Sequence, residues 1–134
     1  MSGCVFCQII RKEVPASMVY EDAQVVAFLS NHPVNIGHTL VVPRKHYENI
    51  YEIPKEEAAY LFRIVKEMAR AVKDATGFEG IRIVQNNGKD AGQVVFHLHF
   101  HVIPMKPSSQ LRQEHGFRAP ELLDKDTEKI RQRL

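Results

Sequence analysis

Apolar and polar side chains alternate from Phe96 to Val102, and this period of two predicts a β-strand over Gln93–Ile103. One face of the strand would carry only apolar side chains: Val94, Phe96, Leu98, Phe100 and Val102. The opposite face would carry a histidine at every second position: His97, His99 and His101. We expect the apolar face to be buried. Because histidine serves as nucleophile, acid–base group and metal ligand, three in one row indicate chemistry rather than packing.

A helical period replaces the alternation between Pro54 and Gly77. Glu56 and Glu57 would lie in the first turn, where the helix dipole favours acidic side chains, and Gly77 lies just past the expected end. The apolar stripe of this helix has the spacing of a core-facing side: Ala58, Leu61, Phe62, Val65, Met68, Ala69 and Val72. We interpret the stripe as core, with a partner-binding helix as the alternative.

Shorter apolar runs complete the expected elements. Four further strands are predicted, at Ser17–Tyr20, Gln24–Leu29, His38–Val42 and Ile81–Gln85, and further helices at residues 5–13 and 120–134. Pro43 should end the third of these four, and Pro104 and Pro107 should end the histidine strand. Adjacent strands with one long helix inserted favour a single α+β domain over residues 1–134, built on an antiparallel sheet.

Composition narrows the class of protein. The chain has 134 residues, which suits one domain, and its net charge of +2 is not gathered in a basic block, so we expect no nucleic-acid partner. It has no apolar run of transmembrane length and no secretory signal, so we expect a cytoplasmic protein with no membrane partner. Disulfides are unusual in the cytoplasm, so the spacing Cys4-x-x-Cys7 suits a metal site or a redox pair.

All three histidines of a regular strand could hardly bind a single ion. Residues two apart in a strand are separated by roughly 6.7 Å, which places His97 and His101 roughly 13 Å apart. Zinc–nitrogen bonds are only about 2.0–2.1 Å long. At least one histidine therefore has another role.

Nucleophilic catalysis by the central His99 is one such role, because neutral imidazole can form a covalent intermediate. The preceding loop fits an anionic substrate. Gly88 and Gly92 let backbone N–H groups approach a phosphate closely, and Asn86 and Gln93 can donate hydrogen bonds. The simpler alternative is a solvent-exposed strand face with incidental histidines.

The run His97-Leu-His99-Phe-His101-Val-Ile resembles the signature His-φ-His-φ-His-φ-φ of the histidine triad superfamily, in which φ is apolar. Three other stretches resemble the family in the same order: Cys4-x-Phe6-Cys7-x-Ile9-Ile10, Gly37-His38-Thr-Leu-Val-Val-Pro43-x-x-His46 and Ala91-Gly92-Gln93. The resemblance covers residues 4–105, and the tail 106–134 matches no part of the pattern.

The resemblance implies a five-stranded antiparallel sheet with one long helix, and a homodimer that joins two such sheets. It also implies hydrolysis or transfer at the α-phosphorus of a nucleotide, generally a purine nucleotide, through a nucleotidyl-histidine intermediate. His99 falls on the nucleophile, His97 and His101 on the flanking positions, and His38 on a fourth histidine of the site. Other residues fall where relatives contact phosphate, ribose or base: Asn86, Gly92, Gln93, Ser30, Asn31, Val5, Phe6, Ile9 and Phe28. Ordinary core is the alternative for the apolar members of this set.

Two positions depart from the family pattern. Ser30 stands where relatives usually carry an Asp or Asn that binds the ribose hydroxyls, which puts nucleoside selectivity in question; Asn31 could compensate. Val94 stands where many relatives carry Ser or Thr near the leaving group. Because valine donates no proton, a phosphoramidate substrate is less secure than the phosphorus chemistry itself.

Some members of the superfamily bind a structural zinc, and the resemblance assigns its ligands here to Cys4, Cys7, His46 and His97. A closed Cys₂His₂ set is a sound tetrahedral zinc site with no open position for chemistry. A bare thiol pair and a surface His46 are the alternatives. His32 and His115 have no partner pattern and are expected on the surface or in loops.

The main hypothesis is a homodimeric nucleotide phosphohydrolase or nucleotidyl transferase that acts through His99, for example on nucleoside phosphoramidates. A dinucleoside polyphosphate hydrolase is the alternative enzyme. A zinc-stabilised nucleotide-binding scaffold with incidental activity, and a redox protein that uses Cys4 and Cys7, are alternatives of other classes.

Overall fold

The computed structural model describes residues 3–107 and 116–134. Its strands are β1 (Met18–Glu21), β2 (Val25–Leu29), β3 (Thr39–Pro43), β4 (Gly80–Val84) and β5 (Phe100–Met105). Its helices are α1 (Val5–Ile10), α2 (Lys55–Thr76) and α3 (Pro120–Arg131), with a 3₁₀ turn η1 (Lys89–Ala91) before β5. The prediction for His115 lies outside the described residues.

The five strands form one sheet in the order β1-β2-β3-β5-β4, and each neighbouring pair is antiparallel. The β1–β2 hairpin closes at Asp22, whose carboxylate accepts hydrogen bonds from the backbone N–H groups of Gln24 and Val25, both at 2.8 Å. Side chain-to-backbone bonds of this kind are why Asp favours turns. The predicted α+β class with a five-stranded antiparallel sheet is confirmed.

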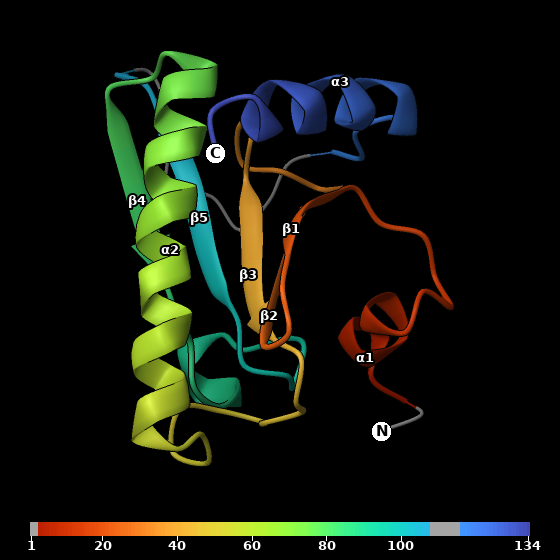
Figure 1. Ribbon diagram of the computed structural model, residues 1–134, viewed down its shortest axis with the longest axis vertical. Helices are drawn as coiled ribbons and strands as arrows, with labels where there is room; N and C mark the ends of the chain where they lie inside the picture. The colour runs from red at the N-terminus through yellow and green to blue at the C-terminus, as the bar shows by residue number, and fades with distance from the viewer. Residues whose placement is uncertain (1–2, 108–115) are drawn as a thin grey trace.

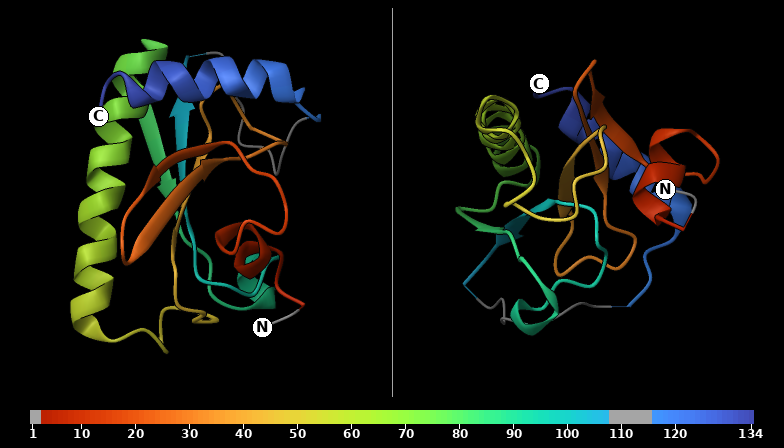
Figure 2. Two further views of the ribbon diagram at one scale, coloured as in Figure 1. Left: turned by 45° about the vertical axis from the view of Figure 1, so that its right-hand side comes forward. Right: turned by 90° about the horizontal axis from the view of Figure 1, so that it is seen from below.

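Helix α2 runs along the sheet, and α3 crosses near one end of it (Figure 1). Figure 2 shows α1 on the other side of the molecule, joined to β1 by an irregular segment. The predicted core stripe of α2 is confirmed at Leu61, Val65, Met68 and Val72, which are all buried. Phe62 is a correction, because it is 52% exposed, with its ring 5.9 Å from that of Phe100.

The histidine strand is shorter than the alternation predicts. β5 begins at Phe100, so His97 and His99 lie in an irregular segment before it, and the expected burial is wrong for Val94 and Phe96, which are 81% and 41% exposed. The physical reason is a competing hydrogen bond. The N–H of Leu98 donates to the carbonyl of Tyr47 at 2.7 Å and turns this segment out of the sheet.

At its other end β5 continues through Pro104 to Met105, so the prediction that Pro104 ends the strand is wrong. The last residue of β5 paired with β3 is Val102, and Pro104 pairs with β4 alone. A proline is tolerated where one side of a strand has no partner. Among the described residues, no helix combines the length and the apolar character needed to cross a membrane.

Candidate active site and metal centre

His99 is buried just before β5, and its ring is held by the backbone. Its Nδ1 lies 2.7 Å from the carbonyl oxygen of His97. Because a carbonyl oxygen only accepts, the proton of the neutral imidazole is on Nδ1 and the lone pair is on Nε2. Burial lowers the pKa of His99 below its usual value, so the ring is neutral near pH 7. His99 therefore presents an unprotonated Nε2.

His38 and His101 form a directed chain of hydrogen bonds. The N–H of Val34 donates to Nδ1 of His38 at 3.0 Å, which leaves the His38 proton on Nε2. That Nε2 lies 3.0 Å from Nδ1 of His101, so His38 donates and the proton of His101 is on its own Nε2. Burial lowers the pKa of His38 to about 3 and that of His101 to about 4, so both are neutral.

The rings of His99 and His101 are adjacent, with centroids 4.9 Å apart. The first offers a nitrogen lone pair and the second an N–H donor. A nucleophile beside a donor suits attack on an electrophile that carries anionic oxygen, such as a phosphoryl group. The predicted residues His38, His99 and His101 thus lie together at the junction of β3 and β5.

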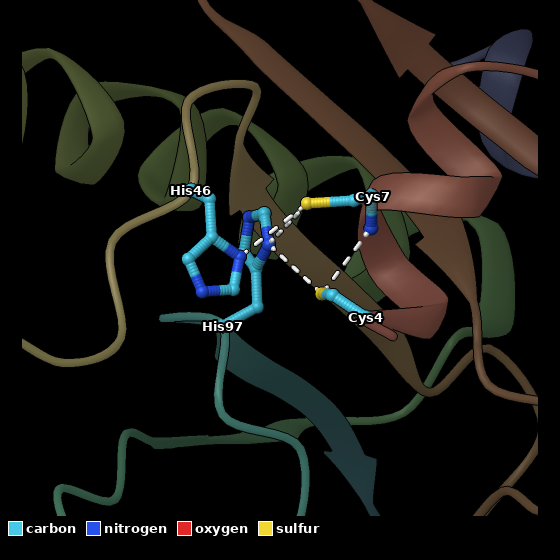
Figure 3. Close-up of side chains that lie close together, drawn as sticks. All are labelled: Cys4, Cys7, His46 and His97. Carbon is cyan, nitrogen blue, oxygen red and sulfur yellow. Dashed lines mark hydrogen bonds between the residues drawn. The ribbon is translucent and has the colours of Figure 1, made fainter. Parts of the chain in front are cut away.

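The fourth predicted histidine, His97, turns away to a separate cluster with Cys4, Cys7 and His46 (Figure 3). Its Nδ1 lies 3.4 Å from Sγ of Cys4 and 3.6 Å from Sγ of Cys7, and the latter sulfur lies 3.3 Å from Nδ1 of His46. All four ligand atoms lie within 4.8 Å of one another. The cluster draws on α1, the segment after β3 and the segment before β5.

The donor set fits a tetrahedral metal ion. Zinc–sulfur bonds of about 2.3 Å and zinc–nitrogen bonds of about 2.0–2.1 Å place neighbouring ligands about 3.5 Å apart. The hydrogen bond from Nε2–H of His97 to the carbonyl of Pro43, at 2.8 Å, directs the lone pair of Nδ1 to the cluster. The four predicted metal ligands are therefore brought together with the atoms that a metal needs.

The loop before His97 is organised by Gln93. Its buried amide accepts from the N–H of Gly88 at 2.7 Å and donates to the carbonyls of Glu48 and Val95 at 2.7 and 3.1 Å. Gly88 and Gly92 have φ values of 91° and 92°, which side chains disfavour. The amide of Gln93 therefore fixes the conformation of the loop through hydrogen bonds to three backbone groups. The side chain of Asn86 lies near Gly92. A Cβ atom added to this glycine would be 3.9 Å from Nδ2 of Asn86.

Three of the four residues expected around a base form a small apolar cluster against the nucleophile. Phe6, Ile9 and Phe28 are buried together with Val26, Leu40 and Val42. The ring of Phe6 meets that of His99 edge to face, at 5.1 Å and 88°. Val5, the fourth of these residues, is 40% exposed and does not belong to this buried cluster.

Ser30 and Asn31 lie at the end of β2, where the C-terminal segment reaches them. The hydroxyl of Ser30 accepts from the N–H of His32 at 3.2 Å, and the carbonyl of Asn31 accepts from the N–H of Arg118 at 2.8 Å. Phe117 stacks edge to face on His32 at 5.7 Å. Sequence reasoning missed Phe117 and Arg118, because no local pattern in the tail indicates a contact 87 positions away.

Comparison with known proteins assigns the domain. Residues 11–108 match the family model described as the HIT domain. An uncharacterized HIT-like protein of Methanocaldococcus jannaschii is 52% identical over 101 residues, which cover 75% of this chain and 78% of that protein. An adenosine 5'-monophosphoramidase of Schizosaccharomyces pombe is 37% identical, covering 81% and 77% of the two chains. An adenylylsulfatase of Arabidopsis thaliana is 38% identical, covering 96% and 66%.

Solved structures agree over nearly the full length. A Hit-like protein of Bartonella henselae superposes with a TM-score of 0.91 at 35% identity, covering 100% of this chain and 98% of that one. A Zn-bound histidine triad family protein of Mycobacterium smegmatis superposes with a TM-score of 0.87 at 32% identity, covering 98% and 93%.

Proposed function

The chain belongs to the histidine triad (HIT) family, and from this premise we propose that it cleaves nucleotides at the α-phosphorus through a covalent bond to His99. The observation that carries the proposal is the protonation pattern of the site. Nδ1–H of His99 is bound to the carbonyl of His97, so the lone pair of Nε2 is available as a nucleophile. His101 supplies an N–H donor beside it.

The two half-reactions follow from these groups. Nε2 of His99 attacks the α-phosphorus, the bond from phosphorus to the leaving group breaks, and the leaving group departs with the electron pair of that bond. The nucleotidyl-imidazolium keeps Nδ1–H against the His97 carbonyl, while His101 donates to a phosphoryl oxygen. Water then attacks phosphorus, the P–N bond breaks, neutral His99 is restored and a nucleoside monophosphate and a proton are released.

Substituted adenosine 5'-monophosphates are the substrate class that we propose. The relatives in Schizosaccharomyces pombe and Arabidopsis thaliana bear the names adenosine 5'-monophosphoramidase and adenylylsulfatase. Val94, which is 81% exposed, has no group to protonate an amine, so leaving groups that need no proton should be cleaved relatively well. Dinucleoside polyphosphates remain the alternative substrates.

Trapping the intermediate tests the proposal. Wild-type protein incubated with adenosine 5'-phosphoramidate, adenylylsulfate or a diadenosine polyphosphate should gain the mass of one adenylyl group on His99 at early times. His99→Ala should lose turnover by at least a thousandfold while it retains the fold and nucleotide binding, because the nucleophile alone is removed. Glu67→Ala is the control, since Glu67 lies on the exposed side of α2. Normal turnover by His99→Ala would refute the mechanism.

We also propose that the Cys4, Cys7, His46 and His97 cluster holds a structural zinc ion. The support is the tetrahedral donor set and the Zn-bound relative from Mycobacterium smegmatis. A closed four-ligand site leaves no position for substrate, so zinc would supply structural cross-linking only. Protein purified without added zinc should contain about one Zn²⁺ per chain; a content near zero with freely titrating thiols would contradict the proposal.

A homodimer is the third proposal, with β4 at its interface. β4 pairs only with β5 among the described strands, so its other edge offers unpaired backbone groups. Ile83 on β4 and Phe62 on α2 are 40% and 52% exposed. The elements β4 and α2 lie on the same side of the molecule (Figure 1). Sedimentation should give the mass of two chains, and Ile83→Glu should give one; a wild-type monomer would contradict the proposal.

A further inference from the structure

His97 takes part in the contacts of both sites. Its fully buried ring contributes Nδ1 to the metal cluster and donates from Nε2 to Pro43. Its main-chain carbonyl accepts the 2.7 Å hydrogen bond from Nδ1–H of His99. The ring and the carbonyl of this one residue thus connect the metal cluster to the hydrogen bond that places the proton of His99.

The sheet does not hold the backbone at this point. The first pair between β3 and β5 is Val41 with Phe100, beyond both histidines. Beside the bond from His97 to Pro43, the segment is held by the bond from the N–H of Leu98 to the carbonyl of Tyr47, the residue after the proposed metal ligand His46. A bound metal would join the same two segments a second time, through His46 and His97.

Helix α1 provides a third connection between the metal cluster and His99, after the His97 carbonyl and the bond from Leu98 to Tyr47. Phe6 lies between the ligands Cys4 and Cys7 on this six-residue helix, and its ring contacts those of His99 at 5.1 Å and His97 at 5.9 Å. α1 belongs to no strand pair, and an irregular segment joins it to β1 (Figure 2). Coordination by Cys4 and Cys7 would hold Phe6 against the nucleophile.

From these three connections we infer that the metal centre positions His99 for attack, so that metal occupancy determines kcat as well as stability. His97 and Phe6 are the positioning residues. The inference rests on the proposed function and on the proposed metal, and it assigns the ion no contact with substrate.

The test uses His46, whose ring pairs with that of His97, whereas Phe6 and His97 carry ring contacts to His99 and α1, respectively, among the described residues. His46→Ala should lose the metal and lower kcat by about tenfold to a hundredfold, the cost of a small misplacement of a reacting group. His46→Cys keeps a four-ligand Cys₃His set and should restore both metal content and kcat. Glu67→Ala, at an exposed position of α2, is the control, and circular dichroism at the assay temperature verifies that each variant is folded.

The second readout is independent of turnover. In substrate-free protein, ¹H–¹⁵N spectra of the imidazoles should show one Nδ1–H tautomer for His99 in wild type and in His46→Cys. In His46→Ala they should show a mixture of tautomers. Wild-type protein stripped with a chelator and refilled with Zn²⁺ should change in the same way and reversibly, which covers the case in which His46→Ala retains metal.

A metal-free, folded protein with wild-type kcat and an unchanged His99 tautomer would overturn the inference. If instead the proposed function is wrong, wild type will form no adduct on His99 with any of the nucleotides. The tautomer spectra would still report whether the metal orders His99, so the two failures are distinguishable.

Discussion

At the scale of the residue, the three histidines of the motif do not share one tautomer: the proton is on Nε2 in His97 and His101 and on Nδ1 in His99. The carbonyls of Pro43 and His97 fix the protons of His97 and His99 on Nε2 and Nδ1 respectively. The N–H of Val34, acting through His38, fixes that of His101 on Nε2. Pro43 and Val34 lie far from the motif in the chain, so the spacing of the motif alone could not have assigned these tautomers.

His38 provides a prediction at this scale. In His38→Asn the side-chain oxygen can still accept from the N–H of Val34, but the shorter side chain no longer reaches Nδ1 of His101. His101 then loses the donor that fixes its tautomer, and we expect kcat to fall about tenfold to a hundredfold with little change in KM. Steady-state kinetics with an adenylyl substrate measure this split. An unchanged kcat would show that the His38–His101 bond is dispensable.

At the scale of the element, the regular parts were predictable and the boundaries next to the site were not. The long helix, the hairpin strands and the C-terminal helix lie close to their expected positions. β5 differs because tertiary hydrogen bonds compete with its ladder: the N–H of Leu98 bonds to Tyr47, and the amide of Gln93 bonds within the loop. Alternation alone cannot reveal such competitors.

The start of α3 carries a prediction of its own. Arg118 pairs with the buried carboxylate of Asp126 through two bonds of 2.6 and 3.1 Å, and its N–H holds Asn31. Arg118→Ala leaves Asp126 unpaired and should lower the free energy of unfolding by about 3 kcal/mol. Chemical denaturation measures this loss.

A double variant separates the loss of the ion pair from the other effects of removing the Arg118 side chain. The double variant Arg118→Ala with Asp126→Ala should recover part of the lost stability, because no charge is then left buried. The exposed pair of Arg11 and Glu13 makes similar bonds, yet Arg11→Ala should cost under about 1 kcal/mol. Equal losses for Arg118→Ala and Arg11→Ala would contradict the argument from burial.

At the scale of the whole molecule, buried neutral histidines make stability depend on pH. The pKa values of His38 and His101 in the native protein, about 3 and about 4, lie below the usual value near 6.5. Between about pH 6.5 and pH 4 the unfolded chain binds protons at these positions and the native protein does not. The free energy of unfolding therefore decreases as pH falls, by about 1.4 kcal/mol per pH unit for each such proton.

Urea titrations at pH 7.5, 6 and 5 check this prediction. The double variant His38→Asn with His101→Asn should lose less stability as the pH falls. The cluster of Cys4, Cys7, His46 and His97 is unchanged in this variant and contributes equally to both proteins. The same pH dependence in wild type and double variant would exclude these two histidines as its source.

The sequence by itself determined the family, the α+β class, the long helix and the residue types of both sites, because short motifs and local periodicity carry that information. Only the tertiary structure decided how the histidines divide between the sites. A carbonyl of β3 and two thiols near α1 turn the His97 ring to the metal cluster, and the His97 carbonyl holds His99 with its lone pair free. It also brought Arg118 to Asn31. Apart from the bond between His97 and His99, these contacts join residues far apart in the chain, and their geometry exists only once the sheet has formed.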